Sequence, residues 1–152
     1  MATRRDAGQA LVEFAVVLPL LLVLLLGMID LGRVVWAHDT AANAAREGAR
    51  YASVRGDSSL TPDASKQQIR DHVNGWLLGS AAAPAVTVCY SQVRIAQEIA
   101  GCSGNSDEPG ATNARGALVT VSVTTSVGLV ASGLLGLGDF SVTASSTMLV
   151  SN

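Results

Sequence analysis

The stretch that decides the fold is GQALVEFAVVLPLLLVLLLGMID, residues 8–30. Phe14–Ile29 are sixteen consecutive uncharged residues, and the apolar residues just upstream bring the run close to the about 20 that span roughly 30 Å of hydrocarbon. Arg4 and Arg5 precede the run, which favours an N-terminus in the cytoplasm and a C-terminal part outside it. Glu13 lies just inside the start, where a carboxylate is unfavourable in a membrane segment and needs an explanation.

Three interpretations of this segment compete. A secretory signal peptide would end in an A-x-A-like cleavage pattern after the apolar core, but Asp30 and Arg33 intrude there and the fit is poor. A plain single-span anchor fits the length and leaves Glu13 unexplained. In the third interpretation the chain is cut between Gly8 and Gln9, so that the helix begins almost at its new amino terminus.

The cut after Gly8 would explain the acid. Glu13 would become the fifth residue of the mature chain, about one helical turn from the new α-amino group. Attraction between an amine and a carboxylate is much stronger in a low-dielectric setting than in water, and the helix dipole also favours an acid near an N-terminus. The amine can be the chain's own or a neighbour's, which would make Glu13 and Phe14 assembly and register residues. The alternative is an interfacial Glu13 solvated by lipid headgroups.

Composition restricts the function classes. The chain has 152 residues, 49% of them hydrophobic, and a net charge of −2. Only 10 residues are Lys or Arg and 4% are aromatic, so no nucleic-acid partner is expected. Much of the apolar content lies in the segment above. The totals therefore indicate one modest domain tethered to a membrane.

The helical pattern continues beyond Asp30. No proline follows until after Gly56, so we predict one helix from Gln9 to about Val54, roughly 70 Å long. Pro19 should kink the helix or remove one of its hydrogen bonds. One face is polar and the opposite face is small, suited to packing on a sheet of the same domain or on a neighbouring helix; the small residues are Val34, Ala37, Ala41, Ala44, Ala45, Gly48 and Ala52.

The polar face contains Asp39, Asn43, Arg46 and Arg50 at helical spacing. Glu47 and Arg50 can pair across three residues. Arg46, Glu47 and Arg50 are thus a possible partner face, or simply a solvated surface.

The remainder is predicted to hold one short helix and three strands. Thr61 suits a helix N-cap with Pro62 at the first helical position, and Gly79 should end that helix. Its apolar stripe consists of Ile69, Val73, Trp76 and Leu77. Strands are expected at 85–91 (extended by Val93 and Ile95), at 117–127 and within 139–150. The fold class is α+β, a three-stranded antiparallel sheet laid against the long helix.

Cys89 and Cys102 are the only cysteines. No CxxC pattern or nearby histidine accompanies them, so no metal site is expected. If this part is exported, a disulfide is favoured, and a loop of this size is stabilised by roughly 3 kcal/mol. The alternative is a pair of buried free thiols.

No catalytic constellation is present, and we expect no enzyme activity and no cofactor. His38 and His72 stand far apart without acids or cysteines at ligand spacing, which indicates surface or capping histidines. Asp107 and Glu108 have too few companions for a cation site and are expected to be solvated. Neither a nucleotide-binding glycine loop nor a G-x-S-x-G elbow occurs.

Two quoted stretches carry a family resemblance. G|QALVEF, a glycine, four intervening residues, then Glu13 and an aromatic residue, resembles the processing site of pilins and pseudopilins. The longer stretch from Gly8 to Val54, with EFAVVLPLLLVLLLGMID and NAAREGARYA, resembles the TadE-like family, minor pseudopilins of the tight-adherence (Flp-type) pilus system. It covers about a third of the chain.

The resemblance implies a pilin-like fold and three segments: a leader (1–8), a transmembrane and assembly helix (9–30) and an exported domain (31–152). It implies cleavage after Gly8 by a prepilin peptidase, and partners among membrane lipid, other pilin subunits and the inner-membrane assembly machinery. The protein would be a single-pass inner-membrane protein that initiates, caps or supports a pilus used in surface attachment. The alternative is a bitopic envelope protein whose exported domain binds a ligand or partner outside any filament.

Overall fold

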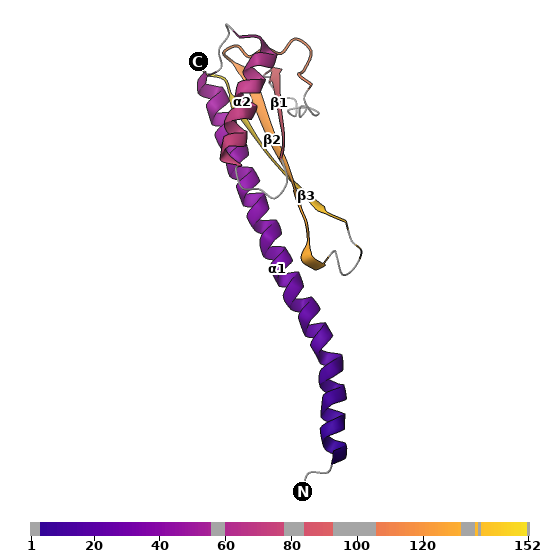
Figure 1. Cartoon of the computed structure of the whole chain (residues 1–152). Helices are drawn as coiled ribbons and strands as arrows, with labels where there is room; N and C mark the ends of the chain where they lie inside the picture. The colour runs from indigo at the N-terminus through magenta and orange to yellow at the C-terminus, as the bar shows by residue number, and fades with distance from the viewer. Residues whose placement is uncertain are drawn as a thin grey trace.

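The computed structural model describes residues 4–55, 60–77, 84–92, 106–131, 136 and 138–151, with the backbone alone for residues 4–7. Two helices precede three strands along the chain: α1 (Arg4–Arg55), α2 (Pro62–Trp76), β1 (Ala85–Gln92), β2 (Ala117–Val127) and β3 (Phe140–Leu149). The helices lie together on the sheet at one end of α1, and the other end of α1 extends well beyond the sheet (Figure 1). This arrangement confirms the predicted α+β class.

α1 is one helix of 52 residues, about 78 Å long at 1.5 Å per residue. It ends at Arg55 as the sequence predicts, although Gly56 itself lies outside the described residues. It begins at Arg4 and not at Gln9, so the five residues up to Gly8 extend the helix in the uncut chain. The helix continues through Pro19, and whether that proline kinks it stays a prediction.

α2 begins as its sequence predicts and ends earlier. The Thr61 hydroxyl accepts a hydrogen bond from the Ala64 N–H at 3.3 Å, which caps the first turn ahead of Pro62. The helix ends at Trp76, and Gly79 lies outside the described residues. Trp76 is 64% exposed, so its assignment to the buried stripe is wrong. As the last residue of the helix it lies at the edge of the stripe, whose buried members are Ile69, Val73 and Leu77.

The sheet is antiparallel throughout, in the order β1-β2-β3. Alternation puts Val119, Val121 and Val123 of β2 in the core, as predicted. The opposite face carries four cross-strand pairs of Ser and Thr, and the Thr120–Thr147 and Thr124–Thr143 hydroxyls lie 2.8 and 2.9 Å apart. The predicted extension of β1 through Val93 and Ile95 lies outside the described residues.

The small face of α1 is buried against the sheet and α2, which confirms that it packs on the chain's own domain. Gly48 is the point of closest approach. A Cβ atom added there would lie 2.5 Å from Val73 Cγ2 of α2 and 3.1 Å from Val121 Cγ1 of β2. Only a residue without a side chain allows these three elements to meet. The alanines that surround it are each at most 5% exposed: Ala41, Ala44, Ala45, Ala49 and Ala52.

The acids of the loop before β2 are structural, so the prediction that they are merely solvated is wrong. Asp107 lies 2.6 Å from the ammonium of Lys66, which is 4% exposed, and accepts the Tyr90 N–H at 2.8 Å. Glu108 accepts the Gln92 N–H at 3.0 Å. These carboxylates therefore satisfy donors along the outer edge of β1, which a sheet edge otherwise leaves unpaired.

We predict that Gly48→Ala lowers the free energy of unfolding of the detergent-solubilised chain by about 1–3 kcal/mol, because the added methyl overpacks the contact with Val73 and Val121. The matched control is Gly75→Ala in α2, where an added Cβ meets nothing within 4 Å. That change should leave stability unchanged or raise it by up to about 1 kcal/mol. Equal effects in denaturant titrations would contradict the packing described for Gly48.

Candidate functional site

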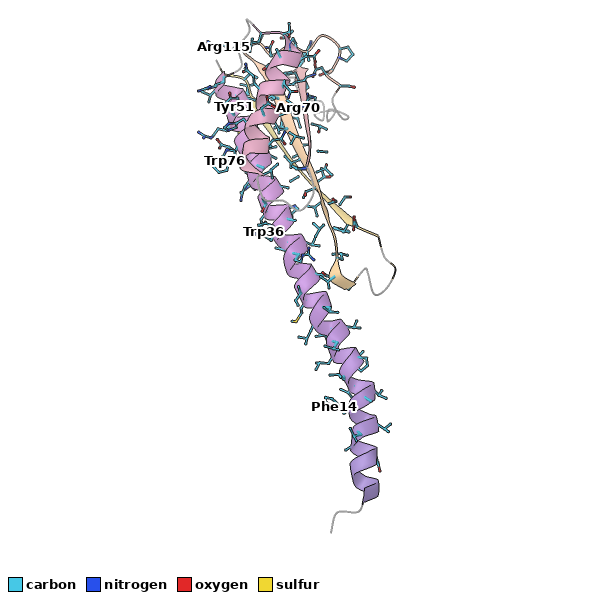
Figure 2. The ribbon with its side chains drawn as sticks, in the orientation of Figure 1. Phe14, Trp36, Tyr51, Arg70, Trp76 and Arg115 are labelled. Atoms are coloured by element: carbon cyan, nitrogen blue, oxygen red, sulfur yellow. The ribbon has the colours of Figure 1, made fainter. Side chains whose placement is uncertain are left out.

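The half of α1 before Asp30 is apolar and uncovered. Every residue from Gly8 to Ile29 is exposed except Leu26, which is half-buried, and Phe14 is 62% exposed. Figure 2 shows Phe14 on the stretch of α1 that extends beyond the sheet. Among the described residues this is the one helix long and apolar enough to cross a membrane. Such a surface calls for lipid or other apolar helices around it.

The predicted processing and register residues lie on this uncovered part. Gly8 and Gln9 are both exposed, and a Cβ added to Gly8 would meet nothing within 4 Å. Glu13 and Phe14 are exposed about one and a half turns further along. The helix places the four residues on an accessible segment, and their roles in cleavage and assembly stay predictions.

A feature that the sequence analysis missed marks the end of the apolar run. Asp30 is only 5% exposed, and its two carboxylate oxygens accept hydrogen bonds from the backbone N–H groups of Val130 and Ala131, both at 2.7 Å. Arg33, one turn along, lies 3.9 Å from the same carboxylate. Asp30 thus joins α1 to the connection between β2 and β3, one hundred residues away in the chain.

The chemistry of this contact is that of a helix cap. Val130 and Ala131 begin a helical turn, whose first N–H groups have no acceptor within the turn. A carboxylate satisfies both donors and also interacts favourably with the positive end of the turn. The contact is therefore a specific lock between α1 and the β2–β3 connection.

A small apolar cluster continues the junction along α1. Ala37 packs with Val127 and Val142, and Val34 and Leu129 pack against this cluster. The β2–β3 hairpin therefore follows α1 down to the level of Asp30, where the uncovered part begins (Figure 1). In this way the orientation of the domain is fixed relative to the apolar half of the helix.

The possible partner face contains one ion pair joined by two hydrogen bonds. Arg50 donates to both carboxylate oxygens of Glu47, at 2.8 and 3.0 Å, which confirms the predicted pairing. Arg46 is exposed beside Asn43, 3.5 Å away. His72 of α2 stacks on Tyr51, with ring centroids 4.2 Å apart, and lies 3.6 Å from Glu47. His72 is thus a packing residue between the helices, whereas the role of this face toward a partner stays a prediction.

The other predicted residues show no catalytic arrangement. His38 is exposed on α1, as predicted. Cys89 is buried in β1 and is not a free thiol, but Cys102 lies outside the described residues and the Cys89–Cys102 disulfide stays a prediction. Within the described ranges no three acids, histidines or cysteines gather as a metal site would require. The arrangement offers helix packing and membrane insertion.

The Asp30 junction can be tested by amide hydrogen exchange in detergent micelles. Asp30→Ala removes the acceptor of the Val130 and Ala131 N–H groups, so their exchange should accelerate by about tenfold or more. Exchange at Val121, in the centre of the sheet, should change little. Asp39→Ala is the control, since Asp39 is exposed on the same helix. Unchanged protection at Val130 and Ala131 would contradict the lock.

The Glu47–Arg50 pair makes a pH-dependent prediction. The hydrogen bonds from Arg50 hold the pKa of Glu47 below its ordinary value of 4.5, and His72 acts in the same direction. A carboxyl whose pKa falls on folding stabilises the protein at pH values above its unfolded-state pKa. This contribution is lost as the pH drops through the lower, folded-state pKa. Glu47→Gln should therefore be less stable than the parent at neutral pH, with the difference shrinking below pH 4.5. A difference independent of pH in denaturant titrations would contradict this.

Comparison with known proteins identifies the N-terminal part alone. The family model described as TadE-like protein matches residues 8–50, which confirms the resemblance found in the sequence. The match contains the apolar half of α1, Asp30 and most of the small face. It ends before α2 and the sheet. No curated protein and no solved structure matches the chain.

Proposed function

We propose, on the premise that residues 8–50 are a TadE-like segment, that this protein is a minor pilin or pseudopilin of a tight-adherence pilus. It is inserted with its N-terminus in the cytoplasm, trimmed after Gly8 by a prepilin peptidase, and packed through α1 with other pilin subunits. Its role is to initiate, cap or support the pilus and so to promote surface attachment.

The observation that carries the proposal is the uncovered apolar half of α1. The domain's own elements leave residues 8–29 exposed apart from the half-buried Leu26, yet the same helix continues without a break into the core of the domain. A helix of this kind suits two successive surroundings, a bilayer before assembly and a bundle of similar helices afterwards. In both, its backbone hydrogen bonds are satisfied internally.

Glu13 then has a specific use. After cleavage, Gln9 would carry the new amine, about 6 Å along the helix axis from Glu13. In the apolar core of a helix bundle an unpaired carboxylate is strongly disfavoured, and an amine beside it relieves the penalty. Where the amine belongs to a neighbouring subunit, a helix shifted from the correct position would leave the Glu13 charge unpaired. Glu13 would thereby select one axial position of the subunit.

The processing step is tested by the side chain at position 8. Gly8→Val should block trimming when the full chain is expressed together with a prepilin peptidase, because the branched side chain obstructs close approach to the scissile bond. Intact mass should show residues 1–8 removed from the parent and retained in the variant. Ala10→Val, two residues away, should still be trimmed. A parent chain that stays uncut would favour a bitopic envelope protein outside any filament.

The assembly step is tested at Glu13. Glu13→Gln keeps the shape of the side chain and removes its charge, so trimming and membrane insertion should persist while co-purification with other pilin subunits falls by about tenfold. Val12→Ala, at the adjacent exposed position, is the control and should assemble like the parent. Normal assembly of the Glu13→Gln protein would show that the register mechanism is wrong.

A further inference from the structure

We propose that the end of the β2–β3 hairpin rests in the headgroup layer of the membrane that α1 spans. This β2–β3 tip is defined as residues 127–131 and 138–142. The inference deepens the proposed function, since it rests on membrane insertion of the apolar half of α1. It makes the β2–β3 tip a second lipid-contacting element, distant in the sequence from the membrane-spanning half of α1.

The position of the tip follows from the Asp30 lock. Asp30 is the first charged residue after Phe14–Ile29, so it marks the outer boundary of the hydrocarbon. Its carboxylate holds the N–H groups of Val130 and Ala131 at 2.7 Å. The lower end of the tip therefore lies at the level where α1 leaves the membrane core.

Exposed apolar side chains surround this level on both elements. Val130 is 48% exposed and Phe140 is 50% exposed on the tip, and Leu31 and Trp36 are each 65% exposed on α1. Trp36 is about 9 Å above Asp30 along the helix, close to the outer limit of an interfacial layer roughly 5–8 Å thick. Trp is the residue type that membrane interfaces favour most, together with Tyr.

The charge pattern is compatible with lipid contact. Asp139 is the one charged residue of the tip, and it is exposed. A headgroup layer tolerates such a carboxylate, whereas the hydrocarbon would not. Asp30, the other anion at this end of the domain, is covered by the tip and hydrogen-bonded to its backbone. The exposed apolar surface is also continuous with the candidate membrane span, which favours lipid over a protein partner as its occupant.

The test uses the full-length chain in phosphatidylcholine vesicles with brominated acyl chains, which quench nearby tryptophan fluorescence. Trp36→Phe and Trp76→Phe remove both native tryptophans. Val130→Trp in this background reports on the tip. Leu149→Trp is the matched control, because Leu149 is similarly exposed, at 51%, and lies at the opposite end of β3. The tip tryptophan should be quenched several-fold more than the control.

Equal quenching of the two reporters would overturn the proposal. So would a tip tryptophan that lipid does not quench but whose emission shifts to the blue when other pilin subunits are added, because the occupant would then be protein. Leu24→Trp in the same tryptophan-free background reports separately on the span, because Leu24 is 59% exposed within the apolar run. If position 24 is quenched and position 130 is not, only the tip inference fails; if neither is quenched, the span is not inserted and the proposed function fails as well.

Discussion

One helix has to suit two different surroundings. Between Gly8 and Ile29 its residues are exposed apart from the half-buried Leu26, whereas from Asp30 to Ala52 one face is buried against a sheet and a second helix. The helix solves this because its backbone hydrogen bonds are internal in both halves. As it is continuous, whatever holds the apolar half also fixes the position and tilt of the domain. Every functional proposal for this chain depends on that mechanical continuity.

Asp30 lies where α1 passes from its apolar half into the domain, and its contact there has two consequences. It caps the turn that begins at Val130, so the domain is locked to the helix at the point where the apolar run ends. The same contact covers a carboxylate at the end of the apolar run, where an exposed charge would be unfavourable beside a bilayer. Glu13, at the other end of the run, is exposed, and the proposed mechanism gives it a partner in the amine that proteolysis would create.

Local signals in the sequence predicted much of the fold. The Thr61 cap, the end of α1 at Arg55 and the strand at 117–127 depend on neighbouring residues, and the structure confirms them. The Asp30 lock joins residues 100 positions apart, and the Lys66–Asp107 pair joins residues 41 positions apart. No local sequence pattern predicts contacts between residues so distant in the chain. Trp76 failed for a related reason, since its burial depends on where α2 ends against its neighbours. The same holds for the candidate site. Its motif at Gly8 and Glu13 could be found in the sequence, but the contact of Asp30 with the domain could not.

The small face of α1 also limits how the protein can assemble. Gly48 and its flanking alanines are already used by the chain's own sheet and α2, which leaves the apolar half and the polar face of Arg46 and Arg50 for the proposed contacts with other subunits. A pilin-type subunit fits this geometry, because its domain projects to one side and leaves the membrane half of the helix free for neighbours.

Central to all of this is the chemical nature of the mature amino terminus. N-terminal sequencing of the protein purified from its native membrane tests it most directly. The cleavage mechanism predicts Gln-Ala-Leu-Val-Glu, with the charged amine one turn from Glu13. A sequence that begins at Met1 or Ala2 would mean that the leader is retained and that Glu13 has no terminal amine to pair with.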